Sequence, residues 1–352
     1  MCFSGGTGGM ERSAVRLAGF LSSITEVVLV CKQDSFTHDL CKQKGDDFKF
    51  ETINFRSRLF SPSMLINVHS IITRHGIGNV IFFGASELKT LYFAFLGHDI
   101  NLVIWHGTTK SRPKHDPVHR LVYSRVNYHV AISEHLGKNV RKIVPPAADT
   151  AFRIIYPSFE IDTGRNTSGH AVSADKLRLV HIGRIAAGKG QVDAVKACGT
   201  LHAAGIRFEL DLLGPAGDDK YSQELNATIE KSGYADHVRL HGFVEDTQAY
   251  LQLADIFLFP SFGEGMPNAF IEALHFGVPC LAYANTVFPE FLTMGFHVTL
   301  AADRDIDDLS DKLLTMVQRM DAEKQASSAN VELAGEYFNV KRELASWQEI
   351  LI

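Results

Sequence analysis

Short, continuous runs of apolar residues recur along the chain and constrain its fold more than any other sequence feature. Four of them, "EVVLVCK", "NVIFFG", "NLVIWHG" and "YHVAIS", lie in the first half, and five, "LRLVHIGR", "FELDLLG", "VRLHGFV", "DIFLFPS" and "VPCLAY", in the second. Runs without polar alternation are typical of parallel strands that helices cover on both faces. Helix-length segments separate the runs, so the sequence predicts an α/β protein with doubly wound sheets.

Two such units are expected, because the pattern is interrupted once. The stretch "TGRNTSGHAVSADK", residues 163–176, is rich in Gly, Ser and Thr and is typical of a linker. With 352 residues, 45% of them hydrophobic, the chain can bury two cores. We therefore place one domain at residues 1–165 and another at residues 166–336.

The charges are divided unevenly between the two halves. Residues 1–160 carry 19 Lys and Arg against 13 Asp and Glu, and the remainder carries 16 against 27, which gives +6 and −11. A basic half favours an anionic partner such as a phospholipid surface or a lipid-linked phosphate, although an uneven solvated surface is the alternative. We expect no nucleic-acid partner.

Nothing in the composition indicates secretion or a metal site. No window holds 18 consecutive apolar residues, and the N-terminus lacks the charged and apolar regions of a signal peptide. The five cysteines are widely spaced and form no CxxC pair, which argues against a disulfide framework and against zinc. The sequence predicts a cytoplasmic protein.

Three loops that follow predicted strands have the residues for binding a phosphorylated ligand. In "GGTGGMER", residues 5–12, four glycines let backbone amides approach an anion, although a tight strand-to-helix turn would need the same residues. It is not the dinucleotide fingerprint, because Glu11 stands where that pattern needs glycine. In "HIGRIAAGKG", Arg184 and Lys189 flank a helix start, which suits a diphosphate. An ordinary solvated loop is the alternative for this pair alone.

The third loop is "PSFGEGMPNAFIEALHFGVP", residues 260–279. Glu264 is expected in the loop and Glu272 about one turn inside the following helix, with Pro267 in its first turn. A carboxylate accepts two hydrogen bonds, which matches the neighbouring hydroxyls of a ribose or a hexose. A capping role for Glu272 is disfavoured because Asn268 lies four residues before it, not three.

The combination of "GGMER", "GRIAAGKG" and "PSFGEGMPNAFIEALHFGVP" closely resembles the retaining glycosyltransferases of family GT4, which have the GT-B fold. The resemblance implies two Rossmann-like domains that face each other across a cleft, with residues 337–352 packed back on the first. It departs from the family at "IIYPSFEID", where Ser158 and Phe159 replace a glycine.

The resemblance also implies residue roles. Arg184 and Lys189 would hold the donor diphosphate, Glu272 the ribose, and Glu264 the transferred sugar, while His106 would lie near the reacting sugar. The full set of implied catalytic residues is His106, Arg184, Lys189 and Glu264, and the implied donor-binding residues are Gly8, Gly9, Gly183, Arg184, Lys189, Glu264, Gly265, Met266, Pro267, Asn268 and Glu272. Ser133 also fits a family position, but we interpret it as a helix N-cap.

The expected reaction needs no metal and no cofactor, because cations and helix dipoles beside the leaving diphosphate would stabilise its charge. Asp303-x-Asp305 resembles the DxD element of metal-dependent transferases, but acidic residues are favoured at a helix start by the helix dipole alone. We assign these aspartates to structure. Retention would then follow from front-face attack, as the resemblance implies, with a donor phosphate oxygen taking the acceptor proton.

The sequence thus predicts transfer of a hexose-like unit from a nucleotide sugar, UDP being the commoner choice, to a glycan or lipid-linked acceptor of cell-surface polysaccharide or lipopolysaccharide synthesis. A phosphorylase or epimerase of the same fold and a non-catalytic nucleotide-sugar-binding protein are the alternatives. The basic stretch "TTKSRPKHDPVHRLVYSR", residues 108–125, is the expected contact with an anionic membrane, which would place the protein peripherally on the inner face. A soluble acceptor and an ordinary basic loop form the alternative.

Overall fold

The computed structural model describes residues 1–55, 61–84, 87–145, 147, 149–159, 161 and 176–351. It divides into two compact units: unit 1 comprises Met1–Pro157 and Val340–Ile352, and unit 2 comprises Ser158–Asn339. The predicted boundary at 165/166 and the predicted linker up to residue 175 lie outside the described residues.

Unit 1 is built on parallel strands. They are β1 (Val28–Lys32), β2 (Lys49–Ile53), β3 (Asn79–Phe83), β4 (Asn101–His106), β5 (Tyr128–Ala131) and β6 (Ala151–Ile154). Strands β1 and β2 pair with each other, and the other four follow in the order β3-β4-β5-β6. Cys2 forms bridges to both Cys31 and Phe83, so the first residues of the chain join the two groups of strands.

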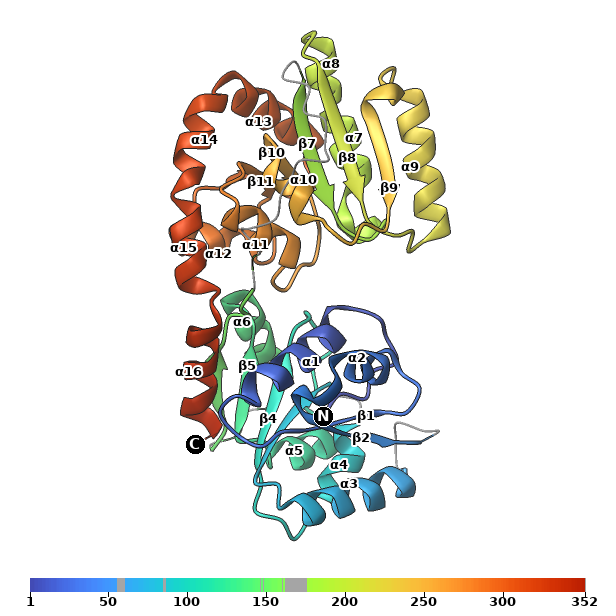
Figure 1. Cartoon of the computed structure of the whole chain (residues 1–352), viewed down its shortest axis with the longest axis vertical. Coiled ribbons are helices and arrows are strands. Elements are labelled where there is room, and N and C mark those ends of the chain that lie inside the picture. The colour runs from blue at the N-terminus through green and yellow to red at the C-terminus, as the bar shows by residue number, and fades with distance from the viewer. Residues whose placement is uncertain are drawn as a thin grey trace. The chain divides into compact units, whose positions relative to one another are not determined.

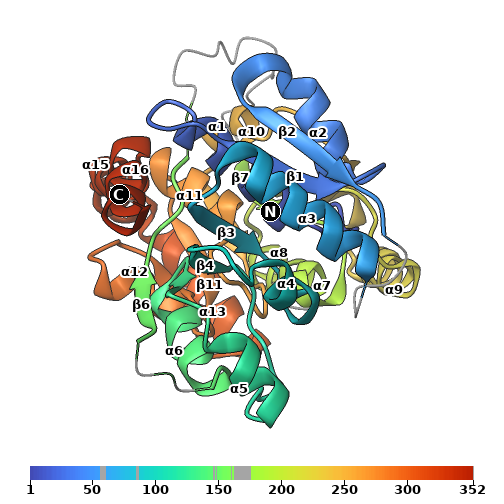
Figure 2. The same ribbon diagram turned by 90° about the horizontal axis from the view of Figure 1, so that it is seen from below.

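Helices cover both faces of this sheet, as Figures 1 and 2 show. They are α1 (Gly9–Leu21), α2 (Phe36–Lys44), α3 (Pro62–His75), α4 (Leu88–Ala94), α5 (Pro117–Tyr123), α6 (Glu134–Ile143) and α16 (Val340–Leu351). Alternate residues of β1 enter different cores: Leu29 packs with α1 and α2, whereas Val30 belongs to the core that includes residues of α3. This two-sided burial explains why β1 has a continuous apolar sequence.

Unit 2 contains one six-stranded parallel sheet of order β12-β11-β10-β7-β8-β9. Its strands are β7 (Leu177–Ile182), β8 (Phe208–Leu213), β9 (Val238–Gly242), β10 (Ile256–Phe259), β11 (Cys280–Tyr283) and β12 (Thr299–Ala301). Its helices are α7 (Gln191–Ala197), α8 (Gly199–Ala203), α9 (Asp219–Lys231), α10 (Gln248–Gln252), α11 (Asn268–His275), α12 (Phe288–Thr293), α13 (Ile306–Gln318), α14 (Met320–Ser328) and α15 (Asn330–Tyr337). The order reverses between β7 and β10, which is the doubly wound arrangement.

The predicted α/β architecture is confirmed, and the nine apolar runs correspond to β1, β3, β4, β5 and β7 to β11. Three strands were missed. The sequences of β2, "KFETI", and β6, "AFRI", mix charged and apolar residues because both strands are only partly buried, and β12 has only three residues. The apolar-run criterion works best for strands covered on both faces, and the three strands that it missed all lie at sheet edges.

The last helix, α16, belongs to unit 1 although the chain reaches it from unit 2. Its Trp347 is only 1% exposed, and the side-chain amide of Asn101 donates to the backbone oxygen of Ile350 at 2.8 Å. The predicted packing region began at residue 337, whereas unit 1 resumes at Val340. The chain passes between the units twice, at residues 157/158 and at 339/340. Next to these two points, within unit 2, the amide of Phe159 donates to the oxygen of Phe338 at 2.8 Å.

Candidate active site

The loops after β7 and β10 meet at the carboxyl edge of the unit 2 sheet, where the strand order reverses. The backbone amide of Phe262 donates to the oxygen of Gly188 at 2.8 Å, and the Ser261 Oγ lies 3.0 Å from the same oxygen. In doubly wound sheets this switch point is where ligands bind. Two of the three predicted ligand loops are therefore neighbours in the folded chain.

Gly190 makes this approach feasible. Its φ is +75°, and a Cβ at this position would stand 1.9 Å from the backbone oxygen of Pro260. Any side chain would push the two loops apart, since such a contact is far inside van der Waals distance. Gly188 is different, because a Cβ there would meet only the oxygen of Phe262, at 3.7 Å. Gly190 is therefore required by packing as well as by backbone conformation.

Lys189 and Glu264 face each other across this junction. The Lys189 Nζ lies 2.6 Å from the Glu264 Oε1, which also accepts from the hydroxyl of buried Ser261. The backbone of Lys189 is held by buried His181, whose Nε2 lies 2.8 Å from the Lys189 backbone oxygen. One predicted cation and one predicted carboxylate are thus brought together and held by neighbouring residues. Ser261 was not predicted, although its place directly after a strand end is a signal that could have identified it.

Arg184 follows β7 and its side chain is exposed. The stem of Arg184 passes over Gly217, where a Cβ would lie 2.5 Å from the Arg184 Cδ. Below it, the side-chain amide of buried Gln191 donates to the backbone oxygens of Gly183 and Arg184 at 3.2 and 3.0 Å. The guanidinium is therefore free to reach a ligand while its backbone is fixed. Gly217 and Gln191 were not predicted, because nothing in their local sequence indicates contact with residues 183–184.

The loop from Gly263 to Asn268 leads into α11. Gly263 has a φ of +81°, which favours glycine, while Gly265 and Met266 are buried. Pro267 precedes the helix as its N-cap and does not lie in the first turn, which corrects the predicted position by one residue. α11 has no side-chain cap, and the Phe270 amide donates to the Pro267 oxygen at 3.2 Å. The amides of Asn268 and Ala269 are therefore the ones that can donate to an anion or a sugar hydroxyl.

Glu272 lies inside α11, as predicted, and is largely withdrawn from solvent. Its Oε2 accepts a long hydrogen bond of 3.5 Å from the Thr247 hydroxyl. Burial raises the pKa of Glu272 from 4.5 to about 7, and the Thr247 bond opposes this only partly. A half-buried carboxyl whose hydrogen bond to Thr247 is long has spare capacity to accept hydrogen bonds from ligand hydroxyls.

The glycine loop of unit 1 is occupied by a carboxylate from its own helix. Gly8 is the N-cap of α1 and Gly9 its first residue. The Gly8 amide donates to the Glu11 Oε2 at 2.9 Å, and Glu11 is only 3% exposed. A phosphate at this helix start would therefore compete with Glu11 for the Gly8 amide. The hydrogen bond between Gly8 and Glu11 was not predicted, because Glu11 was considered only as the residue that does not fit the dinucleotide fingerprint.

His106 ends β4, as predicted for a residue at the carboxyl edge, but it is only 1% exposed. Its Nε2 lies 2.9 Å from the Nδ1 of buried His129, and its Nδ1 lies 3.5 Å from the Lys110 Nζ. An ammonium can only donate, so the Nδ1 of His106 accepts and its Nε2 carries the proton given to His129. Both ring nitrogens thus have partners within unit 1.

The predicted N-cap at Ser133 and the predicted helix start at Asp305 are confirmed. The Ser133 hydroxyl accepts from the Leu136 amide at 3.2 Å as the N-cap of α6. Asp305 is the N-cap of α13 and accepts from the Asp308 amide at 3.0 Å. Asp303 also has a partner, the side-chain amide of Asn285 at 2.6 Å.

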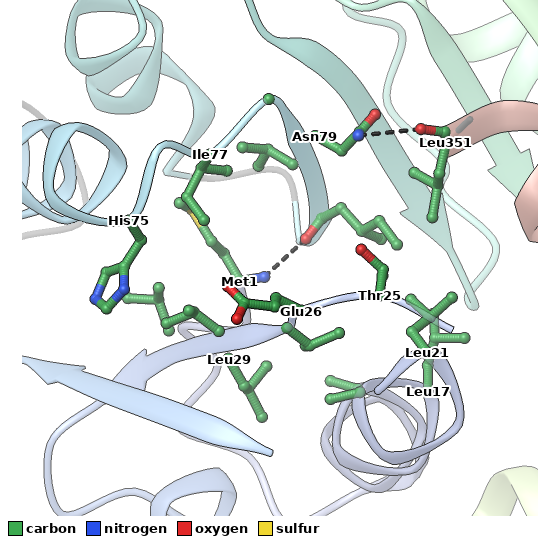
Figure 3. Close-up of a pocket in the computed structure, with 18 of the residues that line it drawn as sticks. Met1, Leu17, Leu21, Thr25, Glu26, Leu29, His75, Ile77, Asn79 and Leu351 are labelled. Atoms are coloured by element: carbon green, nitrogen blue, oxygen red, sulfur yellow. Dashed lines mark hydrogen bonds between the residues drawn. The ribbon is translucent and has the colours of Figure 1, made fainter. Parts of the chain in front are cut away.

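A pocket of about 380 Å³ lies elsewhere in unit 1, and Figure 3 shows its lining. It is bordered by the end of α1, the start of β1 and the start of β3, with Leu21, Leu29 and Ile77 among the lining residues. The amino group of Met1 donates to the Ile81 oxygen at 2.7 Å at its inner wall. The pocket is at the amino ends of the strands, whereas Gly8 and His106 are at the carboxyl edge. We therefore do not assign it to the predicted reaction.

The chain is similar to known glycosyltransferases in sequence. Residues 165–331 match the sequence model of the family described as glycosyl transferases group 1. The putative colanic acid biosynthesis glycosyltransferase WcaL of Salmonella typhimurium is 29% identical over 145 residues, covering 39% of this chain and 35% of that protein. The amylovoran biosynthesis glycosyltransferase AmsK of Erwinia amylovora is 33% identical over 150 residues, covering 40% and 36%. These matches span little more than a third of the relatives' length.

Similarity to solved structures extends over the whole chain. Anabaena HepE in complex with UDP has a TM-score of 0.82 at 18% identity, covering 99% of this chain and 98% of that one. The apo form of the lipopolysaccharide outer core galactosyltransferase WaaB has a TM-score of 0.74 at 16% identity, covering 99% of both chains. At such identities the likeness shows the fold alone. The fold is GT-B, and residues 165–331 of the chain are similar to the group 1 glycosyltransferases.

Proposed function

We propose that the protein transfers a hexose-type sugar from a UDP-linked donor to a glycan or lipid-linked acceptor, with retention at the anomeric carbon and without a metal. The observation that carries this proposal is the Lys189–Glu264 pair, 2.6 Å apart at the switch point of unit 2 and flanked by Arg184. Two cations and a carboxylate at one sheet edge suit a diphosphate joined to a sugar. Structural neighbours that bind UDP and UDP-glucose support the choice of donor.

The chemical step follows from where charge develops. The bond between the sugar C1 and the diphosphate oxygen breaks, and the acceptor oxygen bonds to C1 on the same face. The acceptor proton passes to a phosphate oxygen, so the leaving group departs as a nucleoside diphosphate. Arg184 and Lys189 oppose the negative charge that grows on that group, which lowers the barrier. Glu264 would orient the sugar hydroxyls, and Glu272 the ribose.

The biological setting is proposed from the relatives. The similar proteins WcaL and AmsK are named for colanic acid and amylovoran biosynthesis. We therefore propose that this protein acts in the synthesis of a cell-surface polysaccharide. The acceptor would then be a growing glycan, carried on a lipid or free.

The donor assignment is tested by thermal unfolding of the purified chain with UDP, GDP, UDP-glucose and free glucose. A ligand at about 100 times its Kd adds about 2.7 kcal/mol to the free energy of unfolding. We expect stabilisation by UDP and UDP-glucose but not by glucose. Product analysis then separates the alternatives: release of free sugar phosphate would indicate a phosphorylase, isomerisation of the donor an epimerase, and binding without turnover a non-catalytic protein.

Membrane contact is a separate part of the proposal and rests on the basic stretch of unit 1. The structure divides this stretch. Arg112, before α5, and Arg120, Val118 and Leu121, within α5, are exposed, whereas Arg125 donates to backbone oxygens. None of the described helices is both long and apolar enough to cross a bilayer. We propose that α5 and the segment before it touch an anionic surface through Arg112, Arg120, Val118 and Leu121, with each basic residue adding about 1 kcal/mol.

Co-sedimentation with anionic vesicles tests this contact. We expect the wild type to pellet at low salt and to be released at high salt, since surface charge is screened over about 8–10 Å. The pair Arg112→Glu and Arg120→Glu should stay in the supernatant. Equal pelleting of wild type and variant would refute membrane contact and leave the transferase proposal intact.

A further inference from the structure

A second group of basic side chains lies in unit 1, at the carboxyl end of β4. Lys110 and Lys114 are half-buried, and Lys110 approaches the ring of His106. The Lys114 Nζ donates to the Tyr123 hydroxyl at 2.9 Å and lies 5.4 Å from the centre of that ring. Both ammonium groups are therefore withdrawn from bulk water into a setting of imidazole and phenol groups.

In the described part of the chain, neither lysine forms an ion pair with a carboxylate. Among the residues that the structure describes, neither ammonium has an acidic group within 4.0 Å. Burial, followed by the charge of Lys114, lowers the pKa of Lys110 to about 8. Burial and then Lys89 lower the pKa of Lys114, which Glu87 opposes. Burial also lowers the pKa of His129, to about 3, so the neighbouring imidazole carries no charge at neutral pH.

The backbone holds both lysines in place. The Lys110 amide donates to the Asn139 Oδ1 at 2.9 Å, and the Asn139 Nδ2 returns a bond of 2.9 Å to the Lys110 oxygen. The Lys114 amide donates to the Ile143 oxygen at 2.8 Å. Asn139 and Ile143 belong to α6, so the two lysines are fixed to a helix. Two like charges kept together at a desolvated site cost free energy unless an anion joins them.

We propose that Lys110 and Lys114 form a binding site for a phosphate group carried by the acceptor. The inference rests on the proposed transferase function and narrows the acceptor to a phosphorylated class, such as a glycan linked to a lipid phosphate. Lysine ammonium groups bind phosphate as point charges, and the carboxyl edge of a parallel sheet is where ligands lie. Asn139 acts as a positioning residue, because its contacts orient the Lys110 backbone.

Amine footprinting tests the site with the whole chain. The protein is first saturated with UDP, which prevents pyrophosphate from binding at the donor loops of unit 2. It is then labelled with an amine-acetylating reagent, with and without pyrophosphate. We expect pyrophosphate to slow labelling of Lys110 and Lys114 by about tenfold, as a bound oxyanion blocks both amines. Lys138, exposed on α6, is the internal control and should react at the same rate throughout.

Variants link the footprint to binding. Lys110→Gln with Lys114→Gln should lose the pyrophosphate-dependent heat measured by calorimetry, whereas Lys110→Arg with Lys114→Arg should retain it. A third arm replaces pyrophosphate with vesicles containing phosphatidic acid. Protection by both probes supports a lipid-borne phosphate, and protection by pyrophosphate alone supports a soluble phosphorylated acceptor.

Failure of this inference is distinguishable from failure of the proposed function. If UDP stabilises the protein but pyrophosphate protects neither lysine, the phosphate site is refuted and the transferase proposal stands. If UDP and UDP-glucose give no stabilisation and no turnover, the donor proposal itself falls. The phosphate site would also be refuted if the variant with both lysines changed to Gln gave the same heat of pyrophosphate binding as the wild type. This comparison requires that the midpoint of thermal unfolding of the variant is unchanged.

Discussion

Both units have parallel strands covered by helices, but their charged side chains are arranged differently at the carboxyl edges of the sheets. In unit 2, Lys189 is paired with Glu264 across the β7/β10 junction, and loop glycines hold the two segments together. In unit 1, Lys110 and Lys114 have no acidic partner among the described residues, while the glycine loop satisfies its own amide with Glu11. Similar strand order therefore does not dictate similar ligand chemistry, because the residues after each strand decide what can bind.

The largest expected effect concerns the unit 2 cations. Arg184→Ala and Lys189→Ala should each lower kcat by about 10² to 10³, or roughly 2–4 kcal/mol, because they oppose charge that grows in the transition state. Initial rates with UDP-glucose and a cell-surface glycan fraction measure this. Lys196→Ala, at an exposed lysine of α7, is the matched control and should keep wild-type rates. Wild-type turnover in either single variant would remove the functional contrast between the units.

The second prediction concerns the pH dependence of stability that Glu272 gives to unit 2. Its folded pKa of about 7 lies above the ordinary 4.5, so the folded chain retains a proton that the unfolded chain releases. Stability is therefore greatest below about pH 4.5 for this group and falls as pH rises through 7, by on the order of 1–3 kcal/mol. Glu272→Gln should remove that fall. Urea unfolding at pH 5, 6, 7 and 8 gives the measurement, and parallel curves for both proteins would contradict the assigned burial effect.

Gly190 tests whether the junction depends on close packing. Gly190→Ala combines a φ of +75° with a clash against the Pro260 oxygen, so it should cost roughly 1–3 kcal/mol and weaken UDP binding. Gly188→Ala is the control, because the nearest atom to its Cβ is 3.7 Å away. Thermal unfolding with and without UDP reports both effects. Equal behaviour of the two alanine variants would show that the loops tolerate separation.

The smallest expected effect concerns the aspartates near α13. Asp305→Ala removes an N-cap and should cost about 1 kcal/mol of stability, while turnover stays at the wild-type level and survives excess EDTA. The double variant Asp303→Ala with Asp305→Ala should also keep the wild-type rate, which tests both aspartates together. A strict need for Mg²⁺ or Mn²⁺ that this pair abolishes would reverse the assignment of both residues.

Much of the fold could be read from the sequence, because strands buried on both faces carry continuous apolar runs. That signal weakens at the edges, where β2 and β6 are only partly buried. The site was predictable only as separate loops. The position of Glu264 in its loop and of Glu272 in α11 followed from turn and helix chemistry. Gln191, Gly217 and Thr247, by contrast, have no local signal for their roles.

The sequence by itself determined the two doubly wound units, the three glycine-containing loops, the helix cap at Ser133 and the helix start at Asp305, because each depends on neighbours along the chain. The tertiary structure alone decided the partners of the charges. Lys189 and Glu264 are 75 positions apart and meet only because β7 and β10 are adjacent strands. His106 and His129, 23 positions apart, pair for the same reason across β4 and β5. Side-chain electrostatics depends on distance and burial, and both are properties of the folded chain.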